Sequence, residues 1–484
     1  MSRFCLCAVT TCTLAVVATC AFATEPATTL REQGDGVRVA AEWEPVTGVL
    51  LGWPLKLPRA LVIEMAKDVD LYVTVSNKAG RRRAFKAFTE REIDPARLHF
   101  MITRQGDGYY LPRDWGPFAV FDARGLSRLV DGRYLDYPCA VAGDSKRLTS
   151  LSSLFGLDYI PDDSGPAAVA AELGLPRREL PVALTGGNLF FDGLGTGFAS
   201  QILIDENAAM GIPSDKFLDI LKKELGVVRF HILPNFEGGM GGIQHIDCLL
   251  KLLDEERILI KRPPEDHPDY RRVEAIVGEL AKLVNPYGRP YTLLRIDTPR
   301  YDHDDMANYT NSIIVNRKIF VPLFGIPADQ RALKTWRAAM PGYKVFGFAL
   351  DKNLIDMRYT DAIHCRTRAI WDQKMLRMSH KRLDGRIKSA SGYGFEAEIR
   401  DYSGAGLIED RLRLAWRTSG SPKWTDVRLE PAGTPNAFRG MIQGVRAGQT
   451  IEYYLSAASR SGRNESLPRT APKGFYTFNV EAKP

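Results

Sequence analysis

Residues 312–349 read SIIVNRKIFVPLFGIPADQRALKTWRAAMPGYKVFGFA. Two apolar runs, Ser312–Val315 and Lys318–Pro322, follow one another and are typical of strands. An amphipathic run at Ala328–Met340 then predicts a helix, and Val345–Ala349 predicts a third strand. A simple doubly wound sheet alternates one strand with one helix, so two successive strands do not fit it. This segment therefore predicts an α/β fold that is richer in strands than a doubly wound domain.

The same alternation extends over residues 36–376. The apolar runs that predict further strands are Val49–Trp53, Leu71–Ser76, Arg97–Thr103, Phe118–Phe121, Gly197–Ile204, Val227–Leu233 and Arg257–Lys261. The amphipathic runs that predict further helices are Arg59–Lys67, Ser214–Leu225 and Pro268–Leu283.

The pattern changes after Met378. His380–Gly394 is basic and then rich in Ser and Gly, and it is predicted to be a linker. No convincing helix follows it. Instead, short strand-like runs recur between turns, at Leu412–Arg417, Thr425–Leu429, Ala437–Ile442, Thr450–Ala457 and Phe475–Val480. This pattern is typical of a small all-β sandwich, predicted over residues 390–484.

The composition is that of an ordinary globular protein. Of the 484 residues, 45% are apolar and 25% are charged, which excludes disordered, collagen-like and polytopic membrane chains. The net charge is only +7, and the densest basic run is Arg81-Arg82-Arg83. Neither feature predicts a nucleic-acid partner.

The N-terminus has the features of a secretory signal peptide. Arg3 supplies a positive charge, residues 4–20 are apolar or small, and Ala21-Phe22-Ala23 fits a small-x-small cleavage site. We therefore predict a signal peptide over residues 1–23 and a periplasmic or secreted protein. No later stretch predicts a membrane span.

Removal of that segment would leave three cysteines, Cys139, Cys248 and Cys365. Three thiols form at most one disulfide, so at least one would stay free in an oxidising compartment. A free thiol is a candidate nucleophile, although a buried structural role is common for a single cysteine.

Cys365 lies in Thr360–Arg368, which reads TDAIHCRTR. Nearby arginines and a possible helix start would favour its thiolate form. His364 is adjacent in sequence, but neighbours in a strand point to opposite faces, so it need not be the partner base.

His245 and Asp247 belong to Gly238–Cys248, which reads GGMGGIQHIDC. In an extended segment, residues two apart share a face, so this pair would place an acid or base beside a fixed negative charge. The pair could instead supply two ligands of a metal site, but no third ligand stands at a typical spacing. The glycines do not match a phosphate-binding or dinucleotide-binding loop.

Asp114 and Asn311 complete the set of candidate residues. Asp114, in Arg113–Phe118, could be held rigidly at the mouth of a strand or could simply cap a turn. Asn311, in Tyr309–Ser312, directly precedes a predicted strand. A thiol, an imidazole, an amide and two carboxylates suit a planar guanidinium better than a protease substrate.

These segments give the chain a family resemblance. Over about residues 40–375, it resembles the Porphyromonas-type peptidylarginine deiminases of the guanidine-modifying superfamily. The matching segments are Arg113–Pro117, Gly186–Asn188, Asp192–Thr196, His245–Cys248, Tyr309–Ser312, Ala339–Tyr343 and Thr360–Thr367. The resemblance implies a five-bladed pseudosymmetric pentein, an α/β propeller of ββαβ units, over residues 36–378. The tail at Ile451–Ala458 resembles the immunoglobulin-like domain of that family.

The resemblance also implies roles. Cys365 would attack the guanidinium carbon, and Asp114 and Asp247 would bind the guanidinium nitrogens. His245 would protonate the departing ammonia and then activate water, while Asn311 would orient the cysteine or the intermediate. The substrate would be an arginine-containing peptide or protein and the product citrulline, with no cofactor and no metal.

The substrate pocket departs from the family pattern. Leu111 and Ile243 would line it, but Leu111 replaces a family Trp. Two family arginines that grip a substrate carboxylate are missing at Asp136–Ala140, although other basic residues could substitute, namely Arg133, Lys146 or Arg147. A preference for C-terminal arginine is therefore not predicted. A deiminase of agmatine or free arginine and a non-catalytic guanidine-binding pentein stay open as alternatives, as does the oligomeric state.

Overall fold

A computed structural model describes most of the chain after the predicted signal peptide. The described residues are 36–103, 111–122, 125, 127–134, 138–141, 144–150, 164–236, 244–303, 305–349 and 362–482. The predicted signal peptide over 1–23 and the predicted pocket residue Ile243 lie outside them. Among the described residues, no helix is both long and apolar enough to cross a membrane.

The segment 312–349 forms one compact unit. Strands β18 (Ile313–Val315) and β19 (Lys318–Leu323) pair antiparallel, α9 (Ala328–Ala339) follows, and β20 (Lys344–Ala349) returns parallel to β19. The turn between β18 and β19 contains Asn316 in the left-handed conformation (φ 53°), which Asn tolerates better than most residues. The prediction of two strands, a helix and a strand is confirmed here.

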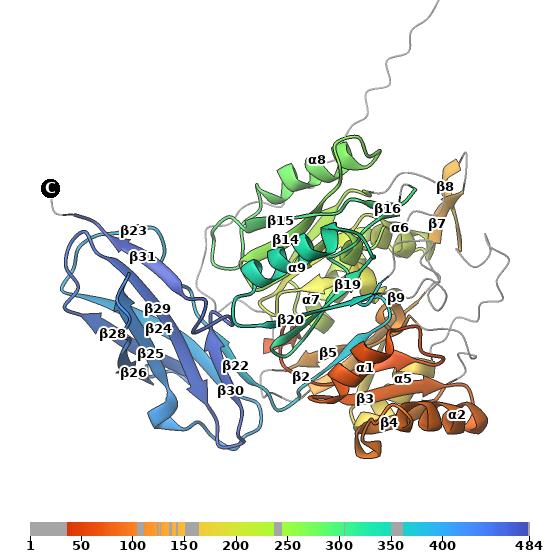
Figure 1. Cartoon of the computed structure of the whole chain (residues 1–484), viewed down its shortest axis with the longest axis horizontal. Helices are drawn as coiled ribbons and strands as arrows, with labels where there is room; N and C mark the ends of the chain where they lie inside the picture. The colour runs from red at the N-terminus through yellow and green to blue at the C-terminus, as the bar shows by residue number, and fades with distance from the viewer. Residues whose placement is uncertain are drawn as a thin grey trace, which may run out of the picture. The chain divides into compact units, whose positions relative to one another are not determined.

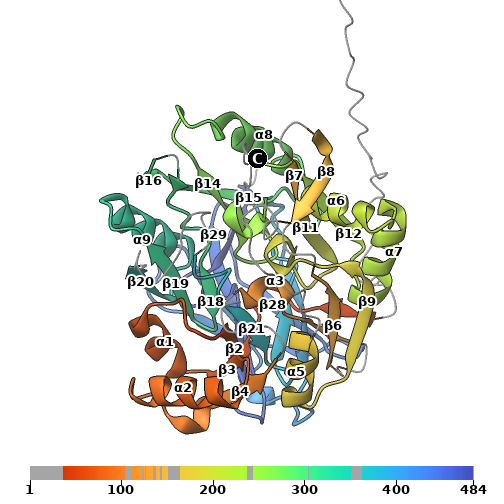
Figure 2. The same ribbon diagram turned by 90° about the vertical axis from the view of Figure 1, so that its right-hand side faces the viewer.

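The same unit recurs in four further sheets of the described chain (Figures 1 and 2). In each sheet one strand pairs antiparallel with one neighbour and parallel with the next. The first sheet contains β21 (Arg368–Trp371), β2 (Val46–Gly52), β3 (Asp70–Val75) and β4 (Leu98–Ile102). The second contains β1 (Arg38–Val39), β5 (Phe118–Phe121), β6 (Ser127–Arg133) and β9 (Arg177–Ala183).

The third and fourth sheets complete the series. The third contains β10 (Phe190–Phe191), β11 (Thr196–Ser200) and β12 (Arg229–Leu233), and the fourth β13 (Leu250–Leu252), β14 (Arg257–Arg262) and β15 (Thr292–Asp297). The helices that connect the parallel strands of these four sheets are α1 (Arg59–Ala66), α2 (Lys78–Thr89), α5 (Ser164–Leu173), α6 (Ile202–Ala209), α7 (Ser214–Leu225) and α8 (Tyr270–Leu280). A mixed α/β fold built from ββαβ units is therefore confirmed.

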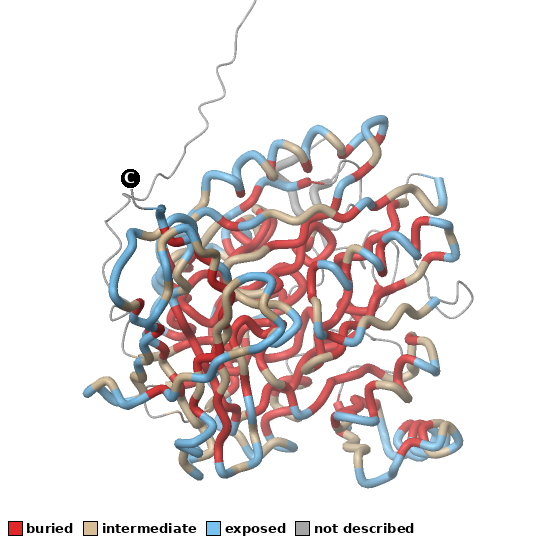
Figure 3. Tube along the Cα trace, turned by 60° about the vertical axis from the view of Figure 1, so that its left-hand side comes forward, coloured by how far each residue is buried: buried red, intermediate tan, exposed pale blue. Residues whose placement is uncertain are grey.

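Strand β21 follows the last unit in sequence but pairs with β2 of the first. This pairing brings the end of the α/β part back to its beginning. The loop that carries Cys365 immediately precedes β21, so the first and last units together position that residue. Figure 3 shows that buried residues follow the strands, while the helices expose their outer faces.

One prediction about a single element is wrong, and the helix α2 was missed. The run Gly197–Ile204 was predicted as one strand, but β11 ends at Ser200 and α6 begins at Ile202. Its apolar residues are buried in both elements, so hydrophobicity alone could not locate the boundary. The helix α2 (Lys78–Thr89) was not predicted from the sequence. Asn77 caps it by accepting a hydrogen bond from Gly80 N.

The C-terminal part consists of two sheets around one hydrophobic core. One sheet has the order β22 (Leu376–Ser379), β24 (Gly392–Asp401), β28 (Ala437–Gln443), β27 (Glu430–Pro431). The other has the order β23 (Arg386–Ile387), β31 (Tyr476–Val480), β29 (Thr450–Ala458), β25 (Arg413–Thr418), β26 (Thr425–Arg428), with β30 (Asn464–Leu467) also on β29. The predicted linker is wrong in part, because His380–Gly394 contains β23 and the start of β24. Aromatic side chains from both sheets share the core, including Phe395, Tyr453 and Phe478.

Candidate active site

The thiol of Cys365 is fully buried and lies against the side chain of Asn311. Asn311 Nδ2 donates a hydrogen bond to Cys365 Sγ over 3.1 Å. Asn311 Oδ1 accepts from the backbone N–H groups of Ala362, His364 and Cys365, over 3.2, 3.0 and 3.3 Å. One amide therefore holds both the cysteine loop and its sulfur.

Asp247 is the carboxylate beside that sulfur. It stands in a single turn of 3-10 helix, η4 (Ile246–Cys248), and its Oδ2 lies 3.5 Å from Cys365 Sγ. Asn188 positions the turn, because its Oδ1 accepts from Ile246 N and from Ser200 N of β11. Among the described residues, no hydrogen-bond partner reaches Asp247 Oδ1, which is buried. A buried carboxylate oxygen of this kind is ready to accept a hydrogen bond from a ligand.

Asp114 and His245 are the second carboxylate and the imidazole of the site, and their side chains face each other. Asp114 belongs to the short helix α3 (Pro112–Trp115), which lies near the middle of the α/β part (Figure 2). His245 Nδ1 lies 3.4 Å from Asp114 Oδ1, which also accepts from Gly187 N. Arg368 of β21 holds α3 in place by donating to the carbonyl groups of Arg113 and Pro117.

Gly187 allows these groups to converge. It lies in η3 (Gly186–Asn188), and a Cβ atom added there would stand 2.6 Å from Asp114 Oδ1 and 2.7 Å from His245 Nδ1. The same atom would lie 3.4 Å from Asp247 Oδ2. Residues from three distant parts of the chain therefore meet at one point. The structure brings together Cys365, His245, Asp247, Asp114 and Asn311, which are the five residues predicted as catalytic from the sequence.

The surrounding charges shift the protonation of His245. Burial alone would lower the pKa of its imidazole, but the carboxylates of Asp114, Asp247 and Glu206 raise it above the ordinary value. Glu206 is itself buried, and burial raises the pKa of its carboxyl to about 7. The site thus favours the protonated form of the His245 imidazole.

Asp247 is kept ionised by its neighbours. Burial would raise the pKa of this carboxyl, but the hydrogen bond and charge of His364 lower it below the ordinary value, as do the charges of His245 and Lys251. An ionised Asp247 can bind a cationic ligand.

His364 and Glu42 are parts of the site that the sequence analysis did not identify. His364 Nδ1 lies 2.7 Å from Asp247 Oδ2, and its Nε2 lies 2.5 Å from Glu42 Oε1. Residues 363–366 form a turn and not the extended strand in which His364 and Cys365 would point to opposite faces. Glu42 also accepts from Lys251 over 3.4 Å and from Arg113 over 3.5 Å. A second, fully buried layer of charges therefore supports Asp247.

This layer has strongly shifted protonation equilibria. Burial would raise the pKa of Glu42, but the charges of Arg113, Lys251 and His364 hold it well below the ordinary value. Burial, together with the charge of Arg113, lowers the pKa of Lys251 to about 8. Glu42 is the ionised centre of the layer.

The predicted substrate-binding residues are only partly described. Leu111 is half-buried at the N-terminal end of α3, and its carbonyl accepts from Asp114 N. Arg133 is exposed at the end of β6. The side chains of Lys146 and Arg147 lie outside the described residues, as does Ile243.

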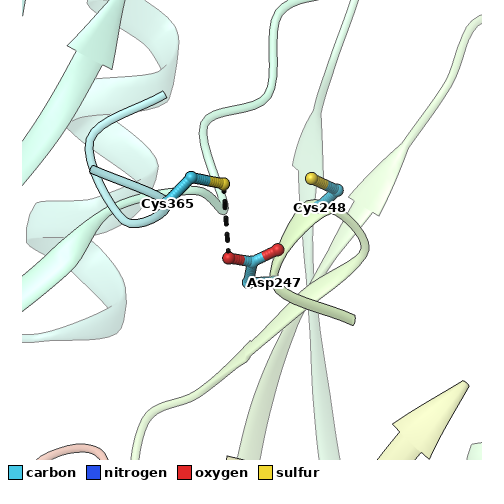
Figure 4. Close-up of side chains that lie close together, drawn as sticks. All are labelled: Asp247, Cys248 and Cys365. Atoms are coloured by element: carbon cyan, nitrogen blue, oxygen red, sulfur yellow. Dashed lines mark hydrogen bonds between the residues drawn. The ribbon is translucent and has the colours of Figure 1, made fainter. Parts of the chain in front are cut away.

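The two cysteines whose side chains are described, Cys248 and Cys365, are both buried. Asn311 Nδ2, which donates to Cys365, also lies 3.7 Å from Cys248 Sγ. Figure 4 shows Cys248, Cys365 and Asp247 with their polar atoms turned toward a common centre.

Comparison with known proteins identifies a family. The profile of the family described as Porphyromonas-type peptidyl-arginine deiminase matches residues 38–370. A curated protein of Shewanella frigidimarina named "Putative agmatine deiminase" is 24% identical over 376 residues, which cover 71% of this chain and 96% of that protein.

Solved structures share the fold. The structure of the "Putative Arginine Deiminase from Porphyromonas gingivalis" has a TM-score of 0.54 at 23% identity and covers 69% of this chain and 98% of that one. The agmatine deiminase of Enterococcus faecalis has a TM-score of 0.55 at 19% identity, over 70% and 97% of the two chains.

Proposed function

The chain belongs to the Porphyromonas-type peptidyl-arginine deiminase family, and from this premise we propose that it converts peptidyl arginine to citrulline and ammonia. The observation that carries the proposal is the convergence of one imidazole and two carboxylates at Gly187, with the Cys365 thiol 3.5 Å from one of these carboxylates, that of Asp247. The two carboxylates suit the planar guanidinium cation, which donates pairs of hydrogen bonds.

The proposed reaction proceeds in two steps. In the first, the Cys365 thiolate forms a bond to the guanidinium carbon while Asp114 and Asp247 hold the nitrogens, and ammonia leaves with the proton that His245 gives up. In the second, His245 takes a proton from water, which attacks the thiouronium carbon and releases Cys365 and citrulline. One water is consumed for each ammonia released. The raised pKa of His245 supports its role as the acid of the first step.

The substrate class rests on two sequence features. The predicted signal peptide at residues 1–23 and the additional all-β part are both features that a cytosolic polyamine enzyme does not need. We accordingly propose a periplasmic or secreted enzyme that acts on peptides or proteins, with an immunoglobulin-like C-terminal domain. A second candidate, deimination of agmatine, is favoured by the names of the curated relatives.

A substrate panel distinguishes these candidates. Citrulline and ammonia would be measured with a peptide carrying internal arginine, a peptide ending in arginine, free arginine, and agmatine, which yields carbamoylputrescine and ammonia. We expect the highest kcat/KM on one of the peptides and no turnover by Cys365→Ala. Turnover of agmatine alone would replace the proposal with the second candidate. Guanidine binding without any turnover would indicate a non-catalytic pentein.

A further inference from the structure

The proposed reaction uses only one of the two buried thiols. Cys248 directly follows Asp247 and has no part in that reaction, yet its sulfur lies near the nucleophile. One carboxylate oxygen of Asp247 and the sulfur atoms of Cys248 and Cys365 all lie within 4.8 Å of one another. All three side chains are fully buried, and they come from two segments that are more than one hundred residues apart in the sequence (Figure 4).

Two further observations point to a ligand at this place. Asp247 Oδ1 is buried, and no hydrogen-bond partner reaches it among the described residues. Asn311 Nδ2 lies within hydrogen-bonding reach of both sulfurs, at 3.1 Å from Cys365 and 3.7 Å from Cys248. An amide N–H directed at two sulfurs would stabilise them as thiolates, in the way that hydrogen bonds to metal ligands support those ligands.

We propose that Cys365, Cys248 and Asp247 form a binding site for Zn²⁺ and that the bound metal inhibits the enzyme. Zn²⁺ prefers thiolate and carboxylate ligands in a tetrahedral arrangement, and a water molecule would take the fourth position. Ligand atoms of a tetrahedral zinc stand roughly 3–4 Å apart, so small rotations of these side chains complete the site. Each thiol that is protonated beforehand releases its proton to solvent, and no oxidant is needed.

Inhibition follows from which atoms the metal occupies. Zinc would bind the nucleophilic sulfur and one of the carboxylates that hold the guanidinium, so metal and substrate would compete. A chelator would restore activity. The inhibitory consequence rests on the proposed function, whereas the binding site itself does not.

Metal binding is tested first without any assay of activity. Co²⁺ would be added to the full-length protein under a reductant that does not bind metals, and the thiolate-to-cobalt charge-transfer absorption would be recorded. We expect this absorption in the wild type, a reduction to about half in Cys248→Ala and in Cys365→Ala, and its loss in the double variant. Cys139→Ala is the matched control and should keep the full absorption. Equal absorption in wild type and double variant would overturn the proposal, as would its absence in the wild type.

Inhibition is tested in the deiminase assay at buffered concentrations of free Zn²⁺. We expect Cys248→Ala to retain the basal rate and to need at least about tenfold more zinc for half-inhibition, because one thiolate ligand is gone. Equal inhibition of the two proteins would overturn the inhibitory site. A cobalt signal in a protein with no turnover on any substrate would leave the metal site standing and refute the proposed function.

Discussion

At the scale of single residues, His245 is governed by the carboxylates that surround it. Asp114, Asp247 and Glu206 together raise the pKa of its imidazole, against the effect of burial. A group whose pKa is raised in the folded protein keeps its proton at pH values above its ordinary pKa, which is 6.5 for His245, and loses the proton only at a higher pH. The acid needed for ammonia departure is therefore available up to a higher pH than an ordinary histidine would allow.

We predict a bell-shaped dependence of kcat/KM on pH. The alkaline limb should fall above pH 6.5, where His245 loses its proton, and the acid limb should reflect protonation of the coupled thiol. Rates measured between pH 5 and 10 on an arginyl peptide test this expectation. A decline that is already complete at pH 6.5, or a rate that rises monotonically, would contradict the role given to His245.

Glu42 provides a second prediction at this scale. It is buried among His364, Lys251 and Arg113, and its loss would leave the cationic Lys251 and Arg113 without their counterion. We expect Glu42→Gln to lower the free energy of unfolding by about 3–5 kcal/mol, as for other broken buried ion pairs. Urea denaturation at pH 7 measures the change.

The matched control is Glu90→Gln, which removes an exposed ion pair to Lys86 on α2. Its effect should stay below about 1 kcal/mol. Similar losses for the two variants would show that Glu42 is not the centre of a buried charge layer.

The residues predicted as catalytic and the supporting pair of Glu42 and His364 differ in how well the sequence could predict them. Asp114, His245 and Cys365 stand in short motifs whose chemistry is local, so a set of candidates could be formed from the sequence. Glu42 and His364 could not be linked, because they are separated by more than three hundred residues and meet only through the pairing of β21 with β2. A pattern in sequence does not record which buried carboxylate faces which ring nitrogen.

At the scale of elements, the ββαβ segment was predictable because its strands and helix differ clearly in periodicity. The ends of β18, β19, α9 and β20 lie within one residue of the predicted ends. Where a strand runs directly into a helix, as from β11 to α6, buried apolar residues continue across the boundary, and the boundary could not be predicted. The turn η3 was also unpredicted, although it is the element on which the site converges.

Substitution of Gly187 tests the importance of η3. An added Cβ would approach Asp114 Oδ1 and His245 Nδ1 to less than 3 Å, and these buried side chains have little room to move. We expect Gly187→Ala to reduce kcat/KM by about a hundredfold, because small displacements of catalytic groups are costly.

Gly278→Ala, on the exposed face of α8 with open space around it, is the control. It should leave kcat/KM unchanged and stabilise the fold by about 0.5–1 kcal/mol. Full activity of Gly187→Ala would show that the convergence at this glycine is not required.

At the scale of the whole molecule, the buried residue Glu44 links the α/β part to the first strand of the C-terminal sheets. Its Oε1 accepts from Arg38 over 2.9 Å and from Arg377 of β22 over 3.2 Å. Arg377 also donates to the carbonyl of Gly193. Such long-range pairs could not be predicted from periodicity, which assigned a linker to the segment just after β22.

We predict that Arg377→Ala destabilises the protein by about 2–4 kcal/mol at pH 7, because the buried carboxylate of Glu44 loses one of its two guanidinium partners. Arg413→Ala is the control, since its ion pair with Asp426 is exposed and should contribute less than about 1 kcal/mol.

The contribution of this link should depend on pH. Burial alone would raise the pKa of Glu44, but the charges of Arg38 and Arg377 lower it below its ordinary value of 4.5. The stabilisation is therefore present above pH 4.5 and is lost as the pH falls through the lower, folded-state pKa. Urea denaturation of wild type and Arg377→Ala should give a difference that shrinks from pH 7 toward pH 3, and a difference that is independent of pH would refute the charge-based origin of this link.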